Sequence, residues 1–129
     1  MAEQRFYEQE VAASLFGELQ DSLRRLPHYA MAYRTLNRVF LITLDQKTRM
    51  AGVRFNGPFA KTDYLLKEHH APRALRATVN EARVHLRRLQ ETDEETMAAN
   101  FLHDWKAVCQ FVALVFQTPV PSLLEIHFP

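Results

Sequence analysis

The residues of this sequence that are best suited to chemistry are four arginines within one segment. They recur at offsets of three, seven and four: Arg73, Arg76, Arg83 and Arg87. In a helix these offsets form one row, which Asn80 completes and which we expect on the face away from Leu75 and Val79. The planar fork of arginine suits phosphate or carboxylate oxygens. The row therefore predicts a surface that binds anions.

The charge around this row is distributed unevenly along the chain. Residues 1–23 carry five acids and one arginine, net −4; residues 24–88 carry fourteen Lys or Arg and four acids, net +10; residues 89–129 carry six acids and one lysine, net −5. Lys61, Lys67, His69 and His70 lie close before the row, and we expect them to extend it into one positive surface.

Three interpretations of this surface remain open from the sequence. It could contact the phosphates of a nucleic acid, or an acidic protein surface, including another copy of this chain. Alternatively, the acidic first and last helices could pair with the basic middle within the fold, in surface ion pairs worth about 0–1 kcal/mol each. The sequence pI of about 8.0 lies below the range that marks a strongly basic nucleic-acid domain.

Other candidate chemistry is weaker, and we expect no catalytic residue, metal or cofactor. No two histidines have the three- or four-residue spacing of a helical metal site, although His85 and His103, beside Asp104, could meet across helices. Cys109 lies in an apolar run that would keep a thiol inert. No glycine-rich phosphate-binding motif occurs. Tyr29 and Tyr33 share a segment with Arg34 and Arg38, a pairing of aromatic and basic groups that can bind single-stranded nucleic acid, but Tyr33 falls on an apolar stripe and is expected in the core.

The element expected to organise the fold is a helix over about 93–117. Thr92 and Glu95 have the spacing of a capping box, and Pro119 ends the helix. Apolar residues recur along it every three or four positions: Met97, Phe101, Trp105, Val108, Val112 and Val115. Between 107 and 116 only Gln110 is polar, which indicates burial on most sides.

Four further helices are expected around it, over 2–25, 28–44, 58–69 and 72–90, with a last turn at 122–125. Their bounds follow from apolar periodicity and from Pro27, Pro58 and Pro72. The segment 39–44 favours a helix but also suits a strand by residue type, and 45–55 is left open between helix, irregular chain and half of a small β-hairpin.

The sequence thus predicts a single all-α domain over 1–129, a bundle of five or six helices. The sequence has one cysteine and an N-terminus unlike a signal peptide, which predicts a cytoplasmic protein. It has no long apolar run, so no membrane span is expected. We expect a non-enzymatic interaction or assembly module, whose partner is an acidic protein or itself. The alternative is a nucleic-acid-binding accessory protein that uses the arginine row.

Overall fold

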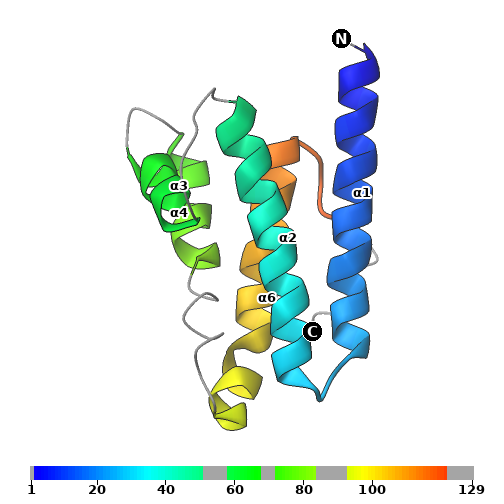
Figure 1. Cartoon of the computed structure of the whole chain (residues 1–129), viewed down its shortest axis with the longest axis vertical. Coiled ribbons are helices and arrows are strands. Elements are labelled where there is room, and N and C mark those ends of the chain that lie inside the picture. Colours follow the sequence, from blue (N-terminus) through cyan, green and yellow to red (C-terminus); the bar gives the residue numbers. More distant parts are fainter. Residues whose placement is uncertain (1, 51–57, 68–71, 84–92, 122–129) are drawn as a thin grey trace.

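Helices make up the regular structure of the chain, as the sequence predicts. The computed structural model describes residues 2–50, 58–67, 72–83 and 93–121, and no strand occurs in these ranges. The helices are α1 (Ala2–Arg24), α2 (Tyr29–Met50), α3 (Pro58–Leu66), α4 (Arg73–Ala82) and α6 (Glu94–Phe116). An all-α bundle is therefore confirmed (Figure 1).

The long helices α1, α2 and α6 lie side by side, and the short helices α3 and α4 lie on the other side of α2 from α1 (Figure 1). Helix α6 packs against α1, α2 and α4, whereas α3 packs against α4 and α2. The largest buried side chains come mainly from α6 and α2: Trp105, Tyr33, Phe40, Phe101 and Phe111. The expected central helix is therefore the core of the bundle.

The start of α6 differs from the expected capping box. The N-cap is Asp93 rather than Thr92; its carboxylate accepts hydrogen bonds from the Glu95 amide at 3.0 Å and from the Thr96 hydroxyl at 2.8 Å. A carboxylate at this position also faces the positive end of the helix dipole. The hydrogen bond from Thr96, with that from Glu95, lowers the pKa of Asp93.

Helix α2 is longer than expected. The chain is helical through residues 39–44 and on to Met50, so the strand alternative is wrong for this part, and residues 51–55 lie outside the described ranges. Val39, Phe40 and Leu44 are fully buried. Their packing in the core outweighs the preference of β-branched and aromatic residues for strands. The hydroxyl of Thr43 donates to the Val39 carbonyl, so it is satisfied within the helix.

The shorter helices begin where proline predicts and end earlier than expected. Helix α3 ends at Leu66 rather than 69, and α4 is described to Ala82, with Arg83 as its C-cap. The remainder of the expected helix to 90 and the turn at 122–125 lie outside the described residues. No helix of the described chain combines the length and the apolar character that crossing a membrane requires.

Candidate functional site

The predicted arginine row lies on α4, but its members differ in exposure. Arg73 is exposed, whereas Arg76 and Arg83 are half-buried. The reason is that Arg76 lies three residues before the buried Val79 and Arg83 four after it, so both are its neighbours on the helix surface. At these two positions the predicted row therefore borders the apolar stripe of α4. Arg87 lies outside the described residues.

Two further predicted residues come from α3 and the chain just after it. Lys67, after the end of α3, is exposed, and the side chain of Lys61 is only 21% exposed. We call the five described residues the basic α3–α4 face: Lys61, Lys67, Arg73, Arg76 and Arg83. Residues 58–83 contain these five cations and three acids, Asp63, Glu68 and Glu81, for a net charge of +2.

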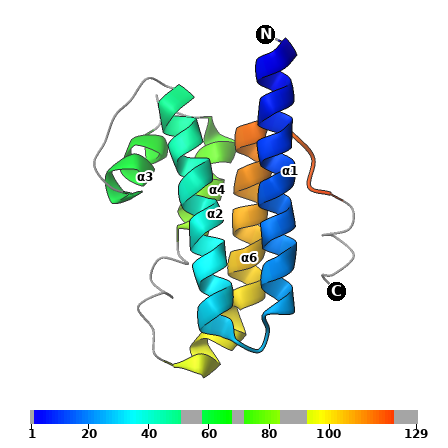
Figure 2. The ribbon, with the colours of Figure 1, turned by 45° about the vertical axis from the view of Figure 1, so that its right-hand side comes forward.

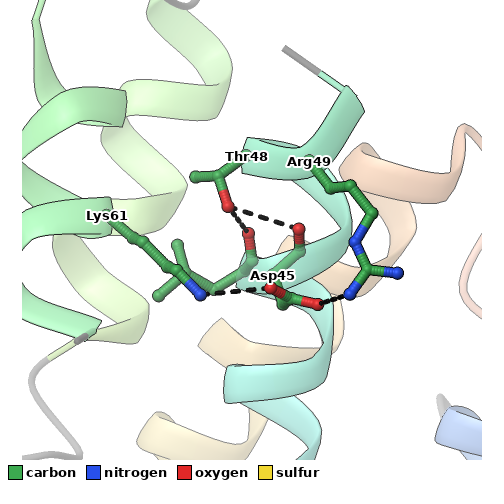
Figure 3. A network of polar contacts seen from close by, with 5 residues as sticks. Asp45, Thr48, Arg49 and Lys61 are labelled. Carbon is green, nitrogen blue, oxygen red and sulfur yellow. Dashed lines mark hydrogen bonds and ion pairs between the residues drawn. The ribbon is translucent and has the colours of Figure 1, made fainter. Parts of the chain in front are cut away.

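Lys61 is held by a polar network that joins α3 to α2. Its ammonium group lies 3.1 Å from Asp45 Oδ1, while Arg49 donates to Asp45 Oδ2 at 2.6 Å (Figure 3). The hydroxyl of Thr48 donates to the carbonyls of Leu44 and Asp45 in the same helix. Lys61 therefore has a structural contact that reduces its availability for a partner.

Arg83 is paired more weakly. Its guanidinium group lies 3.8 Å from Asp63, whose side chain is 71% exposed. At this distance and exposure an ion pair contributes about 0–1 kcal/mol. Arg83 can therefore exchange this contact for another anion at little cost.

The N-terminus of α4 is the most positive part of this face. Pro72 is the N-cap, no side chain caps the helix, and the first turn contains no acid. Arg73 occupies the first helical position, where the helix dipole is already positive. Lys67 precedes it by six residues. An uncapped helix N-terminus with an exposed guanidinium group is suited to attract a carboxylate or a phosphate.

Within the described chain, no acid of α1 or α6 forms an ion pair with Arg73 or Lys67. One ion pair joins α1 to the basic middle, between Glu18 and Arg38 on α2 at 3.2 Å. Further ion pairs lie within α1 and within α2, and join α3 to α2 and to the end of α4.

Among the described residues, the candidate metal ligands do not form a cluster. His103 is exposed while the adjacent Asp104 is fully buried, and no cluster of three metal-ligating side chains occurs among the residues that the structure describes. Cys109 is buried, and its burial raises the pKa of the thiol. The other candidate histidine, His85, and the pair His69 and His70 lie outside the described ranges.

Sequence reasoning missed a set of buried polar contacts in the core. The Tyr33 hydroxyl donates to Asp104 Oδ2 at 2.7 Å, which joins α2 to α6. The Trp105 indole donates to the Leu19 carbonyl at 2.8 Å and lies 3.1 Å from Ser22 Oγ, which joins α6 to α1. A signal for the first contact was present, because Asp104 falls three residues after Phe101 on the apolar face of α6.

Comparison of this chain with known protein families, curated proteins and solved structures finds no match. The charges, burial and contacts of its own residues are therefore the basis for assigning a function.

Proposed function

We propose that this chain is a non-enzymatic binding module whose basic α3–α4 face binds an acidic protein surface. The observation that carries the proposal is the exposed Arg73 at the uncapped N-terminus of α4, close in the chain to the exposed Lys67. A net charge of +2 over residues 58–83 gives this face a long-range attraction for carboxylates.

The position of Arg73 supports a role in binding because it does not serve the stability of α4. A cation in the first turn opposes the helix dipole, and an acid there would stabilise the helix by about 0.3–1 kcal/mol. Residues that destabilise the helix or strand in which they lie are often found at functional sites. An acidic partner would turn this unfavourable placement into a favourable contact, because its carboxylates would meet the guanidinium group and the dipole together.

The number of available cations favours an acidic protein over a nucleic acid. Lys61 and Arg83 already contact Asp45 and Asp63, so Arg73 and Lys67 are the exposed cations of the face as described. Each phosphate contact contributes about −0.9 to the salt slope, and proteins with strong salt dependence make about 6–10 such contacts. Two contacts would give a slope of only about −1.8.

A binding titration tests this proposal with two labelled probes. The first is a glutamate-rich peptide and the second is a nucleic-acid duplex, supplied as DNA and as RNA, each at about 50 mM and about 200 mM salt. We expect the peptide to bind and the Arg73→Glu/Lys67→Glu variant to lose at least about tenfold in affinity. The matched control is Arg24→Glu/Arg25→Glu, which changes the net charge equally at the exposed end of α1 and should bind as the wild type does.

Absence of peptide binding at the lower salt concentration, or an equal loss in both variants, would overturn the proposal. Tighter binding of either duplex than of the peptide, with the loss confined to the Arg73→Glu/Lys67→Glu variant, would instead establish the nucleic-acid alternative.

A further inference from the structure

The outward side of α2 carries a continuous row that the core does not use. Its members follow one another at steps of three or four residues: Met31, Arg34, Arg38, Ile42, Asp45 and Arg49. All are exposed except Asp45, which is half-buried and contacts Lys61 and Arg49. The row is therefore basic, with two apolar side chains, Met31 and Ile42, that are 48% and 36% exposed.

The outward side of α1 carries a row of a different kind. It also has steps of three or four residues, and all its members are exposed: Tyr7, Glu10, Ser14, Gly17, Asp21 and Arg24. Its middle is flat, because a Cβ atom placed on Gly17 would meet nothing within 4 Å. Glu10 and Asp21 lie on either side of this flat part, so the row is acidic around a shallow centre.

The two rows belong to neighbouring antiparallel helices. Helices α1 and α2 lie together in front of α6 (Figure 2), and the ion pair between Glu18 and Arg38 joins them at 3.2 Å. Of the five exposed large hydrophobic side chains in the described chain, three belong to these rows: Tyr7, Met31 and Ile42. We call the two rows together the α1–α2 face; it meets the basic α3–α4 face where Asp45 contacts Lys61.

We propose that the α1–α2 face binds a second copy of this chain about a two-fold axis parallel to the helices. This axis lays the acidic α1 of each copy over the basic α2 of its partner, so the face is complementary to itself. An axis at right angles to the helices would instead place acidic row on acidic row, which like-charge repulsion disfavours. Closed two-fold dimers are also the commonest soluble assembly.

The register of this dimer follows from the ion pair within each copy. Glu18 and Arg38 mark equal heights on α1 and α2, and an axis parallel to the helices preserves height. Ile42 lies four residues after Arg38, and Ser14 lies four residues before Glu18, so both are at the same height on these antiparallel helices. Ile42 of one copy therefore faces Ser14 of the other, next to the open space at Gly17. In the other direction, Arg34 lies four residues from Arg38 and Asp21 three from Glu18, so Arg34 of one copy faces Asp21 of the other, which in its own copy pairs with the exposed Arg24 at 3.4 Å. The apolar side chain thus meets the flat centre, and the guanidinium group meets a carboxylate.

A charge-swap experiment tests this pairing directly. Asp21→Arg and Arg34→Glu each place two like-charge contacts in a homodimer, because a two-fold axis repeats every contact. We expect the wild type to dimerise and each variant alone to dissociate at least about tenfold more readily. An equimolar mixture of the two variants should recover dimerisation, since both contacts are again between opposite charges. Sedimentation equilibrium measures all four samples.

A steric variant supplies a readout that does not depend on charge. Gly17→Trp should leave the fold intact, because the added side chain meets open space in the single copy. It should abolish the dimer, whereas Gln110→Trp, at an exposed position on α6, should not. A wild type that stays monomeric at every concentration would overturn the proposal. So would variants that dimerise alone, a mixture that fails to recover, or a mass that grows beyond the dimer with concentration.

Discussion

The contact between Tyr33 and Asp104 shows how single polar residues fix the arrangement of these helices. Both residues are fully buried, and the hydroxyl lies 2.7 Å from the carboxylate. A buried carboxylate is costly unless donors satisfy it. This contact therefore makes one relative placement of α2 and α6 strongly preferred, which apolar contacts alone would specify less sharply.

Replacing Tyr33 by Phe should lower the free energy of unfolding by about 1–3 kcal/mol, because it keeps the ring but removes one hydrogen-bond donor from the buried side chain of Asp104. Urea denaturation measures the change. Tyr29→Phe is the matched control: Tyr29 is half-buried and its ring also packs edge-on against Phe101, at 6.0 Å between centroids. We expect the control to change stability by less than about 0.5 kcal/mol. Equal effects of the two substitutions would contradict the role given to the Tyr33 hydroxyl.

At the scale of the element, apolar periodicity predicted the helices well and their ends less well. The stripe from Met97 to Val115 identified α6 because its spacing matches a buried helical face. Residues 39–44 were ambiguous because β-branched and aromatic types suit strands, and tertiary burial decided for the helix. The cap was misplaced by one residue because Thr92 and Asp93 both have side chains that can cap a helix.

The N-cap of α6 gives a prediction about pH. Hydrogen bonds from Thr96 and Glu95 hold the pKa of Asp93 below its usual 3.8, so the charged form is stabilised by folding. Its contribution is present above pH 3.8 and is lost as the pH falls through the lower pKa of the folded state. Asp93→Asn retains a capping oxygen without the charge.

The wild type should therefore be more stable than Asp93→Asn near neutral pH, and the difference should shrink to zero in strong acid. Urea midpoints of the two proteins, measured at a series of pH values from neutral downwards, test this. A stability difference that grows on acidification would show that the charge of Asp93 does not stabilise the helix.

At the scale of the whole molecule, the sequence revealed the separation of charge but not its placement in space. The spacing of the arginines predicted a row on one helix. The same spacing places Arg76 and Arg83 three and four residues from Val79, so their position beside the apolar stripe could also have been predicted. The row on α2 was missed because Arg34 and Arg38 were considered together with Tyr29 and Tyr33, whereas the fold buries Tyr33 and leaves both arginines exposed. Which acids reach which cations depends on helix packing, and spacing along the chain does not encode it.

The central claim is that the fold leaves the cations of Arg73 and Lys67 free for a partner. The most direct test is the free energy of unfolding of the Arg73→Glu/Lys67→Glu variant, measured by urea denaturation beside the wild type. If the cations serve binding, stability should stay within about 0.5 kcal/mol or rise by up to about 1 kcal/mol, because Glu at the start of α4 suits the helix dipole. A loss of more than about 1 kcal/mol would mean that these cations stabilise the fold itself, and would contradict the account.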